Sequence, residues 1–387
     1  MIIEALRLHA FRNYRDAVLK PHPGMNLFFG ANGSGKTNLL EAVHYCALGR
    51  SHRSAADRET VMRGETAAAC GVTAVHRDGT RSEVSIRLTP EEPRKKQVFI
   101  DRKRAPRIAD LMGHVRCVIF SPEDLQLVRE GPAVRRRFMD MMISQADSGY
   151  FTALQRYGQA LDSRNALLRD TPKGEALPAD LMATYEGLMA EAAAVIMPKR
   201  LAVMARLADA AAEKYAAISG REGERFRAVY SPCCPDPAQL AALLAGRREE
   251  DRVRGTTGLG IHREDIRLSL MGREMKLYAS QGQVRTAALA LKLAQMDYLA
   301  EAAGDPPVLL LDDVMSELDM NRRTRLLREI GGAQTFVTCT DESDLEGLQD
   351  RRTYAVSLGE AGEGIVRETR GGALLPPEAV PEDPDFT

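Results

Sequence analysis

Hydrophobic and polar positions follow two different periods along the chain. In residues 2–118, short apolar runs are separated by turns, a pattern that predicts strands, among them 72–76, 83–88 and 97–100. From 132 to 220, apolar side chains instead recur every three or four positions, which predicts helices. Pro198 is expected to kink or end one of these helices. The helical region therefore interrupts a chain that is otherwise rich in strands.

An apolar run at 25–29, which predicts a buried strand, leads directly into a glycine-rich stretch. The stretch fits the pattern G-x-x-x-x-G-K-[ST], whose fixed positions are Gly30, Gly35, Lys36 and Thr37. Residues 38–45 then carry apolar side chains at helical spacing. Such a loop points backbone N–H groups and the positive end of a helix dipole at phosphate oxygens. Lys36 is expected on the β- and γ-phosphates of a nucleotide, and Thr37 on Mg²⁺.

A second signal of a phosphate site lies far downstream. Residues 308–311 are a continuous apolar run that ends in Asp312 and Asp313. A parallel core strand delivers carboxylates to the edge of a P-loop sheet in this way. Asp312 is expected to hold Mg²⁺ through water. Asp313 is expected to orient or deprotonate the water that attacks the γ-phosphate.

The segment that begins at Ser280 is a third candidate. Ser280 is a favoured N-cap residue, Gly282 permits close backbone approach, and an alanine-rich helical pattern follows over 287–299. By itself this segment could be an ordinary capped helix. One compact subunit has no room to place two helix N-termini on a single γ-phosphate, so we expect the segment to face nucleotide held by a second copy. The chain is therefore expected to dimerise when ATP is bound.

Composition narrows the class of protein without identifying a partner. The chain has 387 residues, 44% of them hydrophobic, enough for one large globular domain or two ordinary ones. It contains no long apolar run and no secretory signal, so we expect a cytoplasmic protein with no membrane association. Six cysteines without a C-x-x-C pair are interpreted as reduced and mostly structural. A net charge of −1 leaves room for no more than a local basic face.

These stretches, taken in order, resemble the motifs of ATP-binding-cassette ATPases. Residues 30–37 resemble the Walker A motif, 280–283 the signature motif, 308–313 the Walker B motif and 316–319 the D-loop. Within that class, the chain resembles the RecF family over roughly residues 1–365. The narrower resemblance rests on four further stretches, at 8–14, 120–125, 135–140 and 261–265.

The RecF resemblance implies a relative of SMC heads that lacks their long coiled coil. We expect an α/β fold, with an ABC-type P-loop ATPase head of mixed β-sheet and helices plus an inserted α-helical lobe. The expected division gives 1–125 and 258–365 to the head and 126–257 to the lobe. Residues 366–387 are expected to be a disordered tail, since the end of the chain is rich in proline and acidic residues.

The same resemblance implies a role in recombinational repair and replication-fork maintenance. It implies that the protein binds double-stranded and single-stranded DNA at gap junctions. It also implies that the protein acts with RecR and RecO to help load RecA. ATP and Mg²⁺ are the implied cofactors. An ATP-bound homodimer would close on DNA, and weak DNA-dependent ATP hydrolysis would release it. Two rival functions stay open, namely the nucleotide-binding subunit of a membrane transporter and a nucleotide-dependent scaffold with vestigial hydrolysis.

The resemblance also carries site residues over by position. The adenine is expected near Arg12 and Asn13. The phosphates are expected on Gly30, Asn32, Gly33, Ser34, Gly35, Lys36 and Thr37. A second subunit is expected to contribute Ser280, Gly282 and Gln283, with Ser316 and Asp319 meeting across the interface. Gln126 is the candidate for the glutamine of the lid loop. The expected catalytic residues are Lys36, Asp312, Asp313 and Ser280, and the expected metal ligands are Thr37 and Asp312.

Two departures from the wider cassette pattern affect the expected chemistry. Asp313 stands where many such ATPases have a glutamate, and its side chain is one methylene shorter, so we expect slow turnover. No histidine follows the next apolar run, at 336–341. Thr338 or Thr340 is the candidate to assist in its place.

Basic clusters are the candidate DNA contacts, because phosphate binding needs only grouped cations. The three runs are Arg94 to Lys96, Arg102 to Arg104 with Arg107, and Arg135 to Arg137. Arg50, His52, Arg53 and Arg58 form a further candidate group after the P-loop helix. Each run could equally be a solvated surface. His262 is expected to be structural rather than a metal ligand, because it has no Cys or His partner at metal-site spacing.

Overall fold

The computed structural model describes residues 1–53, 56–91, 95–172, 174–221, 223–341, 351–370 and 373–375. The chain forms two compact units. Unit 1 comprises Met1–Asp124 and Lys292–Thr387, and unit 2 comprises Leu125–Leu291. The chain thus leaves unit 1 after Asp124 and returns to it at Lys292.

Unit 1 contains an antiparallel sheet with strand order β2-β1-β4-β5-β6-β7. Its strands are β1 (Ile2–Phe11), β2 (Tyr14–Leu19), β4 (Ala68–Val75), β5 (Arg81–Leu88), β6 (Lys96–Ile100) and β7 (Lys103–Ala105). In β5 every second residue is buried, as the alternation of apolar and polar positions requires of a sheet with one covered face. The strands predicted at 72–76, 83–88 and 97–100 are confirmed.

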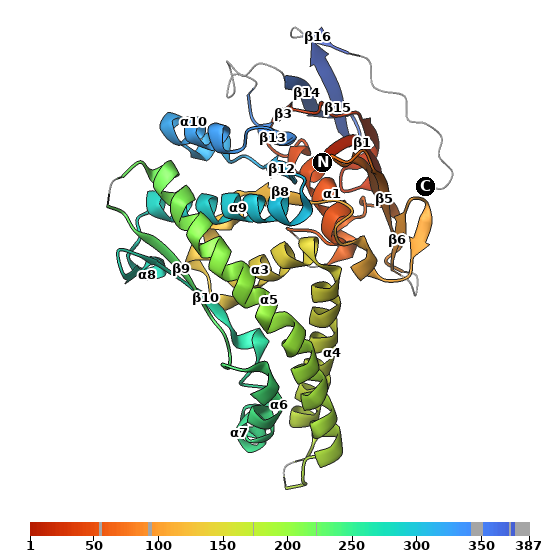
Figure 1. Ribbon diagram of the computed structural model, residues 1–387. Coiled ribbons are helices and arrows are strands. Elements are labelled where there is room, and N and C mark those ends of the chain that lie inside the picture. Colours follow the sequence, from red (N-terminus) through yellow and green to blue (C-terminus); the bar gives the residue numbers. More distant parts are fainter. Residues whose placement is uncertain are drawn as a thin grey trace. The chain divides into compact units, whose positions relative to one another are not determined.

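The second sheet of unit 1 has strand order β16-β15-β14-β3-β13-β12-β8. Its strands are β3 (Met25–Phe29), β8 (Cys117–Phe120), β12 (Val308–Leu311), β13 (Thr335–Cys339), β14 (Arg351–Leu358), β15 (Gly364–Arg370) and β16 (Ala373–Leu374). The five strands from β14 to β8 are parallel, and all four residues of β12 are buried. Helix α1 (Lys36–Leu48) contacts β4 of the first sheet and β8 of the second (Figure 1). It therefore supplies a core shared by both sheets.

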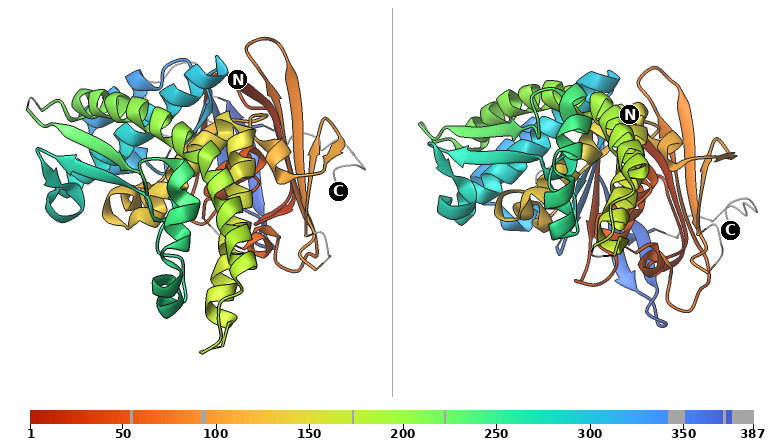
Figure 2. Two further views of the ribbon diagram at one scale, coloured as in Figure 1. Left: turned by 60° about the horizontal axis from the view of Figure 1, so that its bottom comes forward. Right: turned by 90° about the horizontal axis from the view of Figure 1, so that it is seen from below.

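Unit 2 is mainly helical. Its helices are α2 (Gln126–Arg129), α3 (Pro132–Ala146), α4 (Ser148–Asp170), α5 (Ala179–Ser219), α6 (Leu240–Ala245), α7 (Arg248–Arg254) and α8 (Met275–Tyr278). The long helices α4 and α5 pack side by side (Figure 2). A small antiparallel sheet has the order β11-β10-β9, with β9 (Phe226–Ser231), β10 (Asp265–Leu270) and β11 (Arg273–Glu274). Helix α9 (Gln281–Ala303) begins in unit 2 and ends in unit 1, and α10 (Met320–Glu329) lies in unit 1.

Pro198 was expected to kink or end its helix, and the second of these outcomes is wrong. Helix α5 runs through Pro198 and stops at Ser219, where Gly220 adopts a left-handed conformation (φ 60°) as the C-cap. Buried residues continue on both sides of the proline, including Ile196, Met197 and Val203. Packing of that apolar face offsets the hydrogen bond that proline cannot donate.

The expected division of the chain also differs from the structure. Residues 258–291, which we expect in the head, pack within unit 2. There β10 pairs with β9 along its whole length, and the carboxylate of Asp265 accepts two hydrogen bonds from Arg135. The tail does not begin at 366, since β15 continues to Arg370 and β16 follows it. Residues 371–372 and 376–387 lie outside the described residues.

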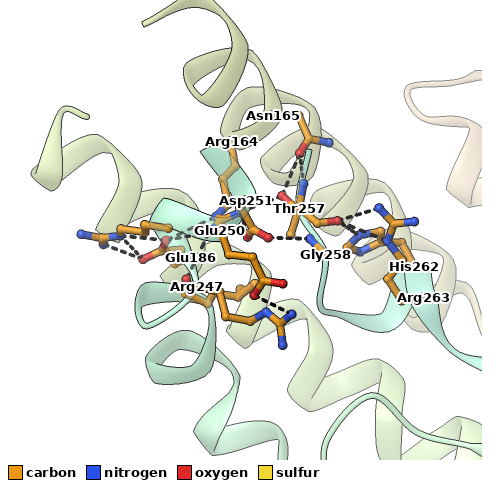
Figure 3. Close-up of polar contacts among 12 residues, drawn as sticks. Arg164, Asn165, Glu186, Arg247, Glu250, Asp251, Thr257, Gly258, His262 and Arg263 are labelled. Carbon is orange, nitrogen blue, oxygen red and sulfur yellow. Dashed lines mark hydrogen bonds and ion pairs between the residues drawn. The ribbon is translucent and has the colours of Figure 1, made fainter. Parts of the chain in front are cut away.

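A buried ionic network joins the helices α4, α5 and α7 of unit 2 to one another (Figure 3). The fully buried guanidinium of Arg164 donates to Asp251 at 2.8 Å and to Glu186 at 3.2 Å. Arg248 binds the second oxygen of Glu186 at 2.6 Å, and Thr257 accepts from Arg164 at 2.8 Å. Two cations thus face two anions, which joins α4, α5 and α7 to the segment that follows α7.

Replacing Arg164 is expected to destabilise the protein strongly. Arg164→Ala leaves the carboxylates of Glu186 and Asp251 buried with one cation fewer, which costs about 3–5 kcal/mol. Arg156→Ala removes an exposed arginine from the same helix and should change the free energy of unfolding by no more than about 0.5 kcal/mol. Urea unfolding followed by circular dichroism measures both. Equal effects of the two substitutions would contradict the importance of the network.

Candidate nucleotide-binding site

The loop between β3 and α1 depends on glycine at two positions of close contact. Gly30 (φ 152°) approaches β14 so closely that a Cβ atom would lie 2.1 Å from the carbonyl oxygen of Val356. A Cβ atom on Gly35 (φ 112°) would lie 2.6 Å from the side-chain nitrogen of Asn13. Side chains at either position would push the loop away from its supports.

The side chain of Lys36 folds back over this loop. Its Nζ donates to the carbonyl oxygens of Gly30 at 2.7 Å and Ala31 at 3.1 Å, and the residue is only 4% exposed. The hydroxyl of Ser34 is buried and has no hydrogen-bond partner in the part of the chain that the structure describes. A cation and an unsatisfied hydroxyl on a concave loop are groups that phosphate oxygens would satisfy.

Asp312 lies beside this loop because of the strand order. Strand β13 is the parallel neighbour of both β3 and β12, so the ends of the three strands meet at one edge. The Asp312 carboxylate accepts hydrogen bonds from the hydroxyls of Thr37 and Thr338, each at 2.8 Å. Burial raises the pKa of Asp312 above the ordinary aspartate value, while these two hydrogen bonds act in the opposite direction.

Asp313 occupies an unusual backbone conformation next to this carboxylate. Its φ is +51°, a left-handed value that aspartate and asparagine tolerate better than most residues. Its backbone N–H donates to the hydroxyl of Thr338 at 2.9 Å. Thr338 is therefore hydrogen-bonded to both acidic residues, whereas Thr340 is exposed beyond the end of β13. Of the two threonines proposed to assist, Thr338 is the one that contacts the Asp312 carboxylate and the Asp313 backbone.

Arg12 and Asn13 contact the loop and α1 in the structure. The Arg12 guanidinium binds both oxygens of the fully buried Glu41, at 2.6 Å and 2.9 Å. Asn13 donates to the carbonyl oxygen of Ser34 at 3.0 Å and accepts from Asn38 at 2.8 Å. The expected contact of Arg12 and Asn13 with adenine stays a prediction.

Comparisons with known proteins identify the family of the chain. The model of the family described as RecF/RecN/SMC N terminal domain matches residues 2–363. A protein of Symbiobacterium thermophilum named DNA replication and repair protein RecF is 38% identical over 384 residues, covering 96% of this chain and all of the relative. This chain belongs to the RecF family.

Other RecF proteins match over similar lengths. The RecF protein of Heliobacterium modesticaldum is 40% identical over 352 residues, which is 88% of this chain and 92% of the relative. A solved structure titled as the recombination mediator protein RecF-ATP in the RecFOR pathway is 32% identical, with a TM-score of 0.85 over 95% of this chain and 98% of that one. An Smc head from Pyrococcus furiosus has a TM-score of 0.56 at 17% identity, over 95% of this chain and 96% of that one, and shows the fold alone. The predicted fold, an ABC-type ATPase head with a helical lobe, is confirmed.

The signature segment of this RecF-family chain is an exposed, capped helix start in unit 2. The backbone N–H of Ser280 donates to the Gln283 side chain at 2.9 Å, and the Gln283 N–H donates to the Ser280 hydroxyl at 3.3 Å. Ser280 is exposed and Gly282 is half-buried. Gln126 is exposed at the first residue of α2, also in unit 2. The expected approach of these residues to a nucleotide stays a prediction.

The D-loop residues lie in unit 1. Asp319 is the N-cap of α10 and accepts from the backbone N–H of Arg322 at 3.0 Å. Ser316 donates to the carbonyl oxygen of Asp313 at 2.8 Å. Both side chains are exposed, and their expected meeting across an interface is untested.

Other residues singled out in the RecF-family sequence have structural partners. Both ring nitrogens of His262 are within hydrogen-bond distance of oxygens, Tyr157 at 2.8 Å and the Thr257 carbonyl at 3.0 Å, and burial lowers its pKa to about 4. Arg135 binds Asp265, and Arg136 donates to the carbonyl oxygen of Glu264 at 2.7 Å, so these two are poor candidates for DNA contact. Arg94 lies outside the described residues.

Over the described ranges, no cluster of metal-ligating side chains occurs, and no helix is long and apolar enough to cross a membrane.

Sequence reasoning missed two residues of the RecF-family site. The hydroxyl of Tyr14 donates to the carbonyl oxygen of Gly35 at 3.1 Å and is fully buried. Glu41 holds Arg12 and also accepts a hydrogen bond from Ser51. The available signal for Glu41 was a lone acidic residue on the apolar side of the helix after the loop.

The raised pKa of Asp312 gives a stability prediction with a defined sign. A carboxyl whose folded-state pKa is raised contributes most below its unfolded pKa of about 3.9, and loses that contribution as pH rises through the folded value. Asp312→Asn carries no such charge. Its free energy of unfolding should therefore rise relative to the wild-type value as the pH increases from about 4, without nucleotide.

Urea unfolding across this pH range measures the difference between the two proteins. Asp209→Asn, which removes an exposed carboxylate from α5, is the matched control. If the free energy of unfolding of Asp312→Asn relative to wild type stayed constant or fell as pH rises, the assigned cost of burying the Asp312 charge would be contradicted.

Proposed function

We propose that this chain is an ATP-dependent DNA-binding protein of replication and recombinational repair. ATP would bind on the loop at Lys36, close two copies into a dimer on DNA, and be hydrolysed slowly to release it. The observation that supports this most strongly is the contact of Thr37, Asp312 and Thr338 beside the phosphate loop. The RecF proteins to which the chain is similar are named for DNA replication and repair and for the RecFOR pathway.

The residues at the strand ends fit a nucleotide with Mg²⁺. Thr37 and Asp312 would hold the ion, which supplies positive charge that offsets the charge of the phosphate oxygens when bound. Burial raises the pKa of Asp312 and so disfavours its ionised carboxylate. The positive charge of the bound ion would offset that cost. Lys36 would exchange its two carbonyl partners for phosphate oxygens.

Asp313 is the residue we assign to hydrolysis. Its backbone N–H donates to Thr338, which would fix the direction in which its carboxylate extends. From there it would orient the attacking water and accept its proton. Because aspartate is one methylene shorter than glutamate, the water would be held less well, and we expect weak ATPase activity.

Dimerisation would complete the site. Ser280 and Gly282 are at an exposed helix start, which can approach the γ-phosphate of a nucleotide bound to another copy. Gln283 and the D-loop residue Asp319 would lie beside them. Only the dimer would satisfy both sides of the triphosphate, so ATP would shift the population from monomer to dimer.

DNA and the partner proteins follow from family membership. We expect the dimer to bind double-stranded DNA next to single-stranded gaps in the cytoplasm and to assist RecO and RecR in loading RecA. A transporter subunit is not favoured, because the relatives that match nearly the whole chain are DNA repair proteins. The scaffold with vestigial hydrolysis stays an alternative that the experiments below separate.

Light scattering with and without MgATP tests the proposal. The wild-type mass should roughly double with MgATP, and duplex binding should require the nucleotide. Ser280→Arg should remain monomeric, because a long charged side chain would replace the hydroxyl that faces the γ-phosphate. Ala217→Arg adds the same charge to an exposed position of α5 and should dimerise normally. The proposal would be wrong if the wild-type mass and its binding of duplex DNA were both the same with and without MgATP.

Asp313→Asn should separate hydrolysis from binding. Asparagine tolerates the left-handed backbone of position 313, so the loop should keep its shape while the proton acceptor is lost. ATP turnover should fall at least about tenfold, and the ATP-bound dimer should last correspondingly longer. Dimer lifetime after removal of free ATP is the measurement. An unchanged lifetime would favour the scaffold over the ATPase.

A further inference from the structure

We propose that the outer face of β5, β6 and β7 binds single-stranded DNA, with a base stacked on Phe99 and phosphates held by Arg87 and Arg104. This inference rests on the proposed DNA-binding function and gives it a specific surface and strand type. The surface is called the hairpin face below and consists of Ser85, Arg87, Gln97, Phe99 and Arg104.

Sheet register places these residues on one side. The inner face of the same strands carries Val84, Ile86 and Val98, all buried. Successive side chains of a strand point to opposite faces, so the residues between these lie on the other side. In the pairing register Phe99 is opposite Ser85 on β5 and opposite Arg104 on β7. Arg87 is paired with Gln97, one diagonal step from Phe99.

The other side of the sheet is the one that α1 covers. Helix α1 contacts β4 and β5, and in Figure 1 β5 and β6 lie at the margin of unit 1 with α1 on one side of them. On the hairpin face Phe99 is only half-buried. Its neighbour Ser85 is small and half-buried, and Gly71 of β4, next in the same row, is buried. The exposed part of the Phe99 ring therefore offers a surface on which a flat base can stack.

Charge on the hairpin face favours a polyanion. Arg87 and Arg104 are both exposed, and neither makes a hydrogen bond or ion pair with any residue that the structure describes. The neighbouring carboxylate on this side, Glu83, is paired with Arg102 at 3.3 Å. Strands β5 and β7 are two strand spacings apart, about 10 Å, so the two guanidinium groups can reach phosphates on either side of one stacked base.

An aromatic ring set in the sheet selects single strands over duplex. In a duplex both faces of each base are already stacked, whereas an unpaired base offers a free face to an aromatic ring. Arginines beside the ring contribute phosphate contacts that carry no sequence information. The hairpin face therefore fits single-stranded DNA with little sequence preference, and binding there needs no nucleotide on the P-loop.

Fluorescence anisotropy with a labelled oligothymidylate of about 15 nucleotides, without ATP, tests the inference on the full chain. Phe99→Leu keeps an apolar side chain but removes the stacking surface, and affinity should fall about tenfold. Phe99→Tyr keeps the ring and should bind within about twofold of wild type, which separates stacking from any loss of folding. Thermal unfolding of each variant verifies the fold.

The charge contribution has a matched control on the same hairpin. Arg104→Gln should weaken binding several-fold and reduce the dependence of affinity on salt. Lys103→Gln removes the same charge from the adjacent residue, whose side chain points to the opposite face, and should have a smaller effect. Equal losses for Arg104→Gln and Lys103→Gln, or equal affinities for Phe99→Leu and wild type, would overturn the inference.

Failure of this inference can be distinguished from failure of the proposed function. Phe99→Leu should still double in mass with MgATP and bind duplex DNA under that condition. If wild type binds duplex with MgATP but Phe99→Leu binds oligothymidylate as tightly as wild type, only the assignment of the hairpin face as the single-strand site is wrong. If wild type binds neither duplex nor oligothymidylate in any nucleotide state, both fail. Tighter binding of duplex than of oligothymidylate without ATP would overturn the selection for single strands.

Discussion

The site depends on one buried carboxylate that is held between two threonine hydroxyls. Asp312 and Thr37 are 275 positions apart in sequence, and only a parallel sheet with β13 between β3 and β12 brings them within a hydrogen bond. Thr338 fills the space between the two strand ends and also fixes the backbone of Asp313. An error of one residue in the register of β13 would put Val337 or Cys339 in the place of Thr338, and the contacts of Thr338 with Asp312 and Asp313 would be lost.

Features that depend on local chemistry could be predicted from the sequence. The strand, loop and helix around Lys36 follow from an apolar run, glycines and helical spacing, and the structure has all three. Asp312 was predictable because apolar parallel strands end at a common edge. The choice between Thr338 and Thr340 was not, because the two residues lie close together at and just beyond the end of β13, and only the three-dimensional register decides which one contacts the Asp312 carboxylate.

Features that depend on tertiary packing could not be predicted in this way. Pro198 has the same local effect in any helix, and only the buried residues around it explain why α5 continues. The run Arg135 to Arg137 has the composition of a DNA contact, yet Asp265, 130 positions away, binds its first member. Residues 258–291 carry motifs expected of the head, but their strand pairs with β9. Composition and periodicity cannot identify a partner so distant in sequence.

The position of β3 in its sheet has a consequence for how the chain is made. Both neighbours of β3, β13 and β14, follow it in the chain after the whole of unit 2. The loop packs against Val356 of β14, and Asn13, which contacts the loop, accepts a hydrogen bond from the Gly364 N–H of β15. A nascent chain that has emerged only as far as α9 therefore has the phosphate loop but lacks the strands that shape it. Residues 25–37 can acquire their working conformation only after the ribosome has synthesised the chain as far as β14.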